Sequence, residues 1–286
     1  SSYFLCKCDC GNIKEIQGSQ LKSGQKSCGC YKPRLNAYKI DKDYFKKINT
    51  EDKAYFFGFI ATDGYIGNHI DNKVIRLELQ KSDKEILNTF RKFLKTKKPI
   101  SYIKRKNNFG LSKSKYFESY ALSILNVKMR DDLINKGIGN KKSYNIEFPN
   151  NKIVPHRLVR HYIRGVFDGD GSISVAKGQS SPICDFISGS YKFLIGFKKY
   201  LEKYKIKNVS IYKNLRKSPV SDKKYNVFNL RIHPSMTKFE TRSVKGKQGF
   251  QKIKSEKRFL NLKLFFNLIY KNSNKKLMLT RKYKKF

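Results

Sequence analysis

The residues of this chain best suited to chemistry are two aspartates that end two copies of one short pattern. The pattern reads FFGFIATDG at residues 56–64 and IRGVFDGDG at residues 163–171. Each copy has apolar residues at helical spacing, so Asp63 and Asp170 are expected in the last turn of a helix, where the helix dipole disfavours a negative charge. The glycine after each aspartate is typical of a helix end. Two carboxylates brought together there would form an acidic pocket suited to a hard divalent cation.

The rest of the chain carries the opposite charge. Its 286 residues hold 63 Lys+Arg against 22 Asp+Glu, a formal net charge of +41. Such a surplus indicates a polyanionic partner, above all nucleic acid, although a ribosomal-type protein or a plain lysine bias would also produce it. Together with the two acids, the charge predicts a metal-dependent enzyme that acts on a polyanion.

No apolar run approaches the roughly 20 residues of a membrane span. The chain starts Ser1-Ser2-Tyr3, without a methionine and without a basic-then-apolar leader. We therefore expect an intracellular protein that is not secreted, and the start of the chain leaves open whether the N-terminus is truncated.

Five of the six cysteines lie within the first 30 residues, in CKCDCG and SCGC. Two close thiolate pairs can supply four sulfurs to a tetrahedral Zn²⁺, and the alternative, a disulfide knot, is rare in intracellular DNA-binding proteins. The pattern CDCGN…L..G…SCGC resembles small zinc modules at the N-termini of phage-encoded endonucleases. That resemblance implies four zinc ligands, which are Cys8, Cys10, Cys28 and Cys30. Cys6 is the alternate ligand. The isolated Cys184 is expected to be a plain core thiol.

The body of the chain contains the same predicted order of helices and strands twice. This order is typical of an α+β fold. Each unit has a helix, two strands, a helix, two strands and a closing helix. In the first unit we expect helices at 52–62, 83–94 and 128–135 and strands at 65–71, 73–80, 100–106 and 116–125. In the second we expect helices at 156–167 and 191–204, strands at 172–175, 183–187, 209–214 and 225–232, and terminal helices. The predicted domains are a zinc module (1–34), a connector (35–50) and two repeats (51–148 and 149–286).

The paired motifs resemble those of the LAGLIDADG homing endonucleases, specifically the single-chain kind, over about residues 52–286. The resemblance implies two pseudo-symmetric αββαββα repeats that form a DNA-binding saddle. Helix packing supports it independently, because small residues at i and i+4 allow two helices to cross at close backbone contact. These pairs are Gly58 with Thr62 and Gly165 with Gly169. Such a crossing would bring the two aspartates side by side.

By that resemblance, Asp63 and Asp170 are the catalytic acids and hold Mg²⁺, for which Mn²⁺ or Ca²⁺ could substitute. The backbone carbonyls of Thr62 and Gly169 are expected to be further ligands. The implied reaction is hydrolysis of both DNA strands across the minor groove, with the metal ions activating water. Asp168 is not expected to be catalytic, because its counterpart in the first motif is Ala61.

Three further residues are implied as catalytic. Gln80 matches a position where many family members place a polar residue that orients water, whereas the second copy has Gly189 there. Lys142 and Lys282 lie in contexts resembling the family's lysines near the end of each half. Their charge could stabilise the attacked phosphate, although any one lysine of so basic a chain is more often a surface residue.

Strand alternation gives a candidate DNA-binding face that would lie in the major groove. The alternative is a strand face that is only solvated. A register error of one residue would move every member of a strand to the other face. The predicted face holds Tyr65, His69, Arg76, Glu78, Tyr102, Lys104, Lys106, Ser119, Ser210, Tyr212, Asn229 and Arg231.

These patterns predict a site-specific endonuclease, encoded by an intron, a free-standing homing gene or a phage locus. It would act as a monomer on double-stranded DNA with a long, roughly pseudo-palindromic site. Two alternatives remain: a LAGLIDADG maturase, which would bind RNA and assist splicing, and a DNA-binding regulator that has lost cleavage. The C-terminal Lys284-Lys285-Phe286 lacks the His-Asn of a splice junction, so an intein is not expected.

Overall fold

The structure, a computed structural model, describes residues 2–9, 11–25, 27–28, 38–67, 74–107, 114–139, 142–175, 182–217, 223–234 and 259–284. The chain divides into two compact units, Ser1–Lys39 and Ile40–Phe286. Residues 40–50 of the predicted connector therefore belong to the larger unit. Tyr44, Phe45 and Ile48 are buried in its core, although charged neighbours surround them in the sequence.

The smaller unit contains an antiparallel hairpin of β1 (Tyr3–Lys7) and β2 (Ile13–Gln17), followed by the short helix α1 (Gly18–Lys22). The hairpin turn is closed by a hydrogen bond from Cys8 N to Asn12 O. Gly11 adopts a φ of 88° in this turn, a conformation that favours glycine.

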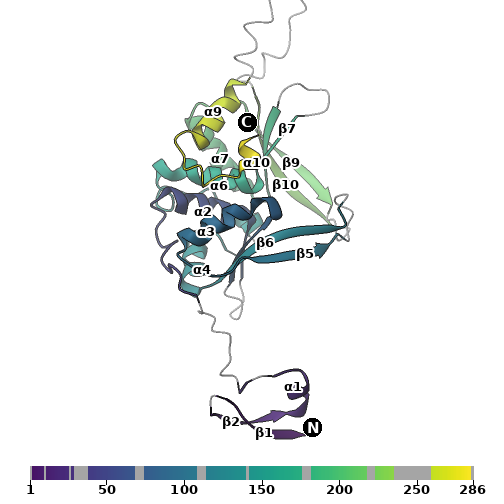
Figure 1. Ribbon diagram of the computed structural model, residues 1–286. Helices are drawn as coiled ribbons and strands as arrows, with labels where there is room; N and C mark the ends of the chain where they lie inside the picture. Colours follow the sequence, from purple (N-terminus) through teal and green to yellow (C-terminus); the bar gives the residue numbers. More distant parts are fainter. Residues whose placement is uncertain are drawn as a thin grey trace, which may run out of the picture. The chain divides into compact units, whose positions relative to one another are not determined.

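The larger unit repeats the predicted element order (Figure 1). Its sheets are antiparallel, with the strand orders β3-β4-β6-β5 and β7-β8-β10-β9. The first repeat contains α2 (Glu51–Asp63), β3 (Gly64–Ile66), β4 (Val74–Gln80), η1 (Lys81–Asp83), α3 (Lys84–Phe93), β5 (Ser101–Lys106), β6 (Tyr116–Leu125), α4 (Val127–Ile134) and α5 (Lys142–Asn145). The second contains η2 (His156–Leu158), α6 (Val159–Asp170), β7 (Ser172–Val175), β8 (Pro182–Ser188), α7 (Tyr191–Lys203), β9 (Val209–Lys217), β10 (Lys224–Ile232), α9 (Leu260–Tyr270) and α10 (Thr280–Tyr283).

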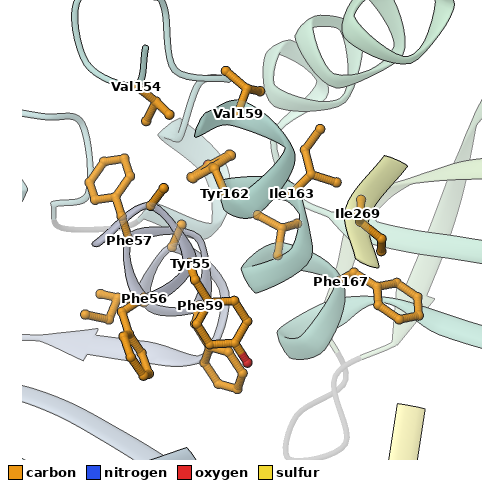
Figure 2. Packing of buried hydrophobic residues seen from close by; sticks show 14 of the residues in the cluster. Tyr55, Phe56, Phe57, Phe59, Val154, Val159, Tyr162, Ile163, Phe167 and Ile269 are labelled. Carbon is orange, nitrogen blue, oxygen red and sulfur yellow. The ribbon is translucent and has the colours of Figure 1, made fainter. Parts of the chain in front are cut away.

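Helices α2 and α6 pack directly against each other in the core (Figure 2). Two glycines allow this contact. A Cβ at Gly58 would overlap the carbonyl oxygen of Tyr162, and a Cβ at Gly165 would overlap that of Tyr55. Both helices are buried around most of their circumference, which explains why their motifs are apolar almost throughout.

Helices α3 and α4 pack on the first sheet and α7 packs on the second, and the alternating burial of β4 marks the covered face of the first sheet. Ile75, Leu77 and Leu79 are buried, whereas the intervening Arg76 and Glu78 are half-buried on the other face. In Figure 1, strands β5, β6, β9 and β10 extend away from the helices. None of the helices in the described ranges is long and apolar enough to cross a membrane.

Candidate active site

Asp63 and Asp170 end helices α2 and α6, and both side chains reach solvent. The helix ends lie against each other, because a Cβ at Gly169 would overlap the Thr62 side chain and lie 3.5 Å from Asp63 Oδ2. Burial, together with the neighbouring negative charge of Asp170, raises the pKa of Asp63 to about 6. Burial also raises the pKa of Asp170. The predicted side-by-side pair of acids is therefore present.

Lys142 and Lys282 hold the carbonyl ends of these two helices. Lys142 Nζ donates to Ala61 O at 2.9 Å and to Thr62 O. Lys282 Nζ donates to Phe167 O, Gly169 O and Gly171 O at 2.7, 2.8 and 2.7 Å. Burial lowers the pKa of both lysines, that of Lys282 to about 8.

The predicted carbonyl ligands, Thr62 O and Gly169 O, thus each accept a hydrogen bond from a lysine ammonium. A metal ion bound to the same oxygen would face that positive charge at short range. The exposed carboxylates of Asp63 and Asp170 carry no such conflict. They are the groups of this site that fit a hard cation best.

Gln80 belongs to a network that joins the two repeats. Its Nε2 donates to Asp83 Oδ2 at 3.0 Å. Arg281, from the far end of the chain, donates from Nε to both Asp83 oxygens, at 3.0 and 2.9 Å, and its Nη2 lies 2.9 Å from Oδ2. Arg281 is also among the positive charges that lower the pKa of Asp63. Sequence reasoning missed both Asp83 and Arg281, and the only available signal was that Arg281 directly precedes the singled-out Lys282.

Asp168 is fully buried and serves as an acceptor for three donors. Tyr55 OH, Tyr270 OH and Leu279 N donate to its carboxylate at 2.8, 3.2 and 2.9 Å. Burial raises its pKa to about 6. These contacts tie α6 to α2, to α9 and to the segment that precedes α10. They place Asp168 in the scaffold behind the acid pair.

In the first sheet, the predicted residues of β3, β4 and β6 lie on one face. Tyr65 pairs with Arg76, and Gln80 pairs with Ser119. Glu78 lies at the centre of this face, where it accepts hydrogen bonds from Arg76 at 2.6 Å, Ser119 at 2.6 Å and Arg105 at 2.5 and 3.0 Å. These hydrogen bonds lower the pKa of Glu78 to about 2 against the opposing effect of burial. His69 lies outside the described residues.

The face assigned to β5 was wrong by one residue. Because Ser119 pairs with Ile103, the odd-numbered residues of β5, including Arg105, share the face of Glu78. The opposite face holds Tyr102, Lys104 and Lys106, together with Glu118 and Tyr120. There Tyr102 OH donates to Glu118, and Lys84 Nζ lies over the ring of Tyr120. The prediction assumed that Ile103 faces the core, but this edge strand is exposed or half-buried throughout.

In the second sheet, the four predicted residues do share one face. Asn229 pairs with Tyr212, and Arg231 pairs with Ser210. Arg231 donates to Asp185 at 2.8 and 3.0 Å and lies over the Tyr212 ring. Asn229 is buried and donates to Tyr212 OH at 3.4 Å. Arginine–carboxylate pairs therefore occupy the corresponding face of both sheets.

In the smaller unit, three of the predicted cysteines line one small pocket: Cys6, Cys8 and Cys28. Asn12 Nδ2 lies 3.7 Å from Cys28 Sγ and donates to it, and Cys6 Sγ donates to Phe4 O. Cys10 and Cys30 lie outside the described residues. Within the part of the chain that is described, no group of three or more metal-binding side chains is gathered, so zinc stays a prediction. Cys184 is fully buried in the core of the larger unit, as predicted.

Comparison with known proteins identifies the family. The LAGLIDADG-like domain matches residues 50–135 and 157–236. The probable translation initiation factor IF-2 of Methanocaldococcus jannaschii is 26% identical over 206 residues, which is 70% of this chain but only 16% of that protein. The homing endonuclease I-WcaI bound to its DNA recognition sequence has a similar fold, with a TM-score of 0.54 and 15% identity over 85% of this chain and 90% of its own. The N-terminal LAGLIDADG domain of DUF199/WhiA is similar at a TM-score of 0.41 and 14% identity, over 83% and 93% of the two chains. The chain belongs to the LAGLIDADG-like domain family, with one motif in each of its two repeats.

Proposed function

We propose that this protein is a site-specific endonuclease that cuts both strands of DNA. The observation that carries the proposal is the pair of exposed carboxylates, Asp63 and Asp170, at the crossing of two buried helices. The charge of Asp170 raises the pKa of Asp63, and a bound cation would stabilise both carboxylates. The net charge of +41 would favour binding of such a site to a polyanion.

Asp63 and Asp170 are the residues that would hold divalent metal, Mg²⁺ or, in its place, Mn²⁺ or Ca²⁺. A bound ion supplies an activated water and neutralises charge on the phosphate. Lys142 and Lys282 keep the helix ends fixed by holding their carbonyl oxygens, so that the carboxylates are positioned before DNA binds. Thr62 O and Gly169 O would become ligands only after the ammonium groups moved away.

The exposed faces of the two sheets would read the DNA. An antiparallel sheet fits the major groove, where each base pair presents a distinct pattern of donors and acceptors. Arg76 and Arg105, pinned by Glu78, and Arg231, pinned by Asp185, are positioned for base or phosphate contacts. Because the two faces belong to related repeats, a single chain would bind a long, roughly pseudo-palindromic site as a monomer.

The N-terminal unit would add contacts at one end of this site. We assign a structural Zn²⁺ to Cys8, Cys10, Cys28 and Cys30. The fit rests on Cys8 and Cys28, which line one pocket, and on the hydrogen bond that Asn12 donates to Cys28, since thiolate ligands accept such bonds from their surroundings.

Cleavage of a host-genomic or randomised DNA library, with Mg²⁺ and with chelator, tests the proposal. Defined double-strand breaks that require the metal are expected. Tight DNA binding without any break would favour a regulator. Binding to a structured intron RNA with assisted splicing, and no DNA cleavage, would favour a maturase.

A further inference from the structure

The surroundings of the two carboxylates are chemically unequal. Lys282 and Lys142 act on both carboxylates, whereas Arg281 is a third positive charge that acts on Asp63 alone of the two. Both acids end equivalent helices, so the difference comes from the elements around them, such as α10, which carries Arg281.

On the Asp63 side, a buried carboxylate pins a guanidinium. Asp83 is only 6% exposed and accepts from Arg281 through Nε and Nη2, while Gln80 donates to the same carboxylate. Nη1 of Arg281 has no protein partner in the described residues, and the side chain is 42% exposed. One edge of the fork is thus fixed by Asp83, and the other is available to a phosphate oxygen.

On the Asp170 side, the equivalent positions lack these groups. Gln80 lies four residues beyond Arg76, the partner of Tyr65, and Gly189 lies four residues beyond Asp185, the partner of Ser172. A Cβ at Gly189 would lie 2.5 Å from Ser143 O and 2.9 Å from the Tyr144 ring, so α5 excludes a side chain there.

The remaining members of the network also differ. Ser190 precedes α7 as Asp83 precedes α3, but its hydroxyl caps Phe193 N and donates to Ile146 O. Arg281 directly precedes Lys282, and the residue that directly precedes Lys142 is a lysine, whose side chain has no planar fork. This lysine lies outside the described residues. A cavity of about 170 Å³ remains beside Asp170, lined in part by Lys142, Ser188 and Gly189.

Lys142 and Lys282 do not compensate for this difference. Lys282 uses its three N–H groups on three carbonyl oxygens and is 7% exposed, so it has no donor left for a phosphate. Lys142 donates to two carbonyls and is half-buried. Among the described residues, the Asp63 side therefore offers a fixed guanidinium and an amide, and the Asp170 side offers the ammonium of Lys142.

We infer that Asp83 is a positioning residue that orients Arg281 and Gln80 at the Asp63 half-site, and that this half-site cuts its strand first. The inference rests on the proposed nuclease function. A donor that is already oriented stabilises charge on the attacked phosphate without reorganisation. Lys142 instead directs two of its N–H groups to carbonyl oxygens. The protein should therefore nick its site before it linearises it.

The test is single-turnover cleavage of the mapped site, with each strand labelled separately. Wild-type protein should accumulate a nicked intermediate that is always cut in the same strand. Asp83→Asn should slow that strand by about 10- to 100-fold and change the other by less than about twofold. Arg281→Lys, which keeps the charge and removes the fork, should slow the same strand. Because each molecule reports both strands, a loss of folded protein lowers both rates together and leaves their ratio unchanged.

Asp131→Asn is the matched control. Asp131 accepts from Arg130 Nε and Nη2 at 3.0 and 2.7 Å on α4, outside the candidate site, so its loss should leave the strand ratio unchanged. Equal rates on both strands in wild type overturn this inference alone. So does an equal slowing of both strands in Asp83→Asn and Arg281→Lys when both variants keep the far-UV circular dichroism spectrum of the wild-type protein. A wild-type protein that cuts neither strand overturns the proposed function and this inference with it.

Discussion

Substituting alanine for Gly58 or Gly165 should destabilise the protein, although alanine normally stabilises a helix. In an ordinary helix the change from glycine gains about 1 kcal/mol. Here the added Cβ would overlap Tyr162 O or Tyr55 O, respectively. Backbone atoms cannot rotate away, so we expect the upper end of the usual overpacking cost, about 3 kcal/mol. The net loss should be about 2 kcal/mol, a large share of a typical stability of roughly 5–15 kcal/mol.

Urea unfolding followed by far-UV circular dichroism measures this loss, since the chain has no tryptophan. Gly139→Ala is the control, because its Cβ would meet only Ile134 side-chain atoms at 3.7 Å or more, and its effect should stay within about 0.5 kcal/mol. The double variant of Gly58 and Gly165 should cost about 1 kcal/mol less than the two single losses combined, because both push the same helices apart. If either single variant is as stable as wild type, the close crossing of α2 and α6 is refuted.

Three further predictions concern the zinc module, the DNA interface and the ion pairs of the first sheet. Chelation or Cys28→Ser should expose residues 1–30 to hydrogen exchange and leave the larger unit protected, because bound metal supplies most of the stability of a small module; loss of protection throughout the chain would contradict this. DNA affinity should fall log-linearly and steeply with salt, since a basic interface releases counterions, and a flat dependence would rule that interface out. Glu78→Gln should be less stable than wild type near neutral pH. The folded-state pKa of Glu78, about 2, lies below its usual 4.5, so its contribution is present above about pH 4.5 and is lost as the pH falls towards 2; a difference that persists at pH 2 would refute the assignment.

Local pattern was enough to predict the acid pair and most of the fold. Period-3.6 apolar spacing with small residues in the motifs of α2 and α6 predicted a helix crossing, and the crossing places Asp63 beside Asp170. Alternation in β4 predicted its buried and open faces, because apolar and polar residues strictly alternate there.

Contacts between distant parts of the chain could not be predicted in this way. Arg281 reaches Asp83 across 198 positions, and neither residue stands out in so basic a sequence. The face of β5 failed for a different reason. Its sequence SYIKRK contains one apolar residue, and in an edge strand that residue does not have to face the core. The buried Phe45 was missed because a charged sequence surrounds it.

The central claim is that Asp63 and Asp170 jointly bind the divalent metal ion needed for DNA cleavage. The most direct test measures cleavage of the mapped site by Asp63→Asn and Asp170→Asn with Mg²⁺. DNA affinity is measured in metal-free buffer, and Asp168→Asn is the comparison variant in both assays. Asparagine keeps the shape but removes an anionic ligand, so each variant should cut several orders of magnitude more slowly and bind DNA as tightly as wild type or more tightly. Asp168→Asn should lose stability more than rate, because its carboxylate accepts from Tyr55, Tyr270 and Leu279. Normal cleavage by the Asp63 and Asp170 variants would contradict the account.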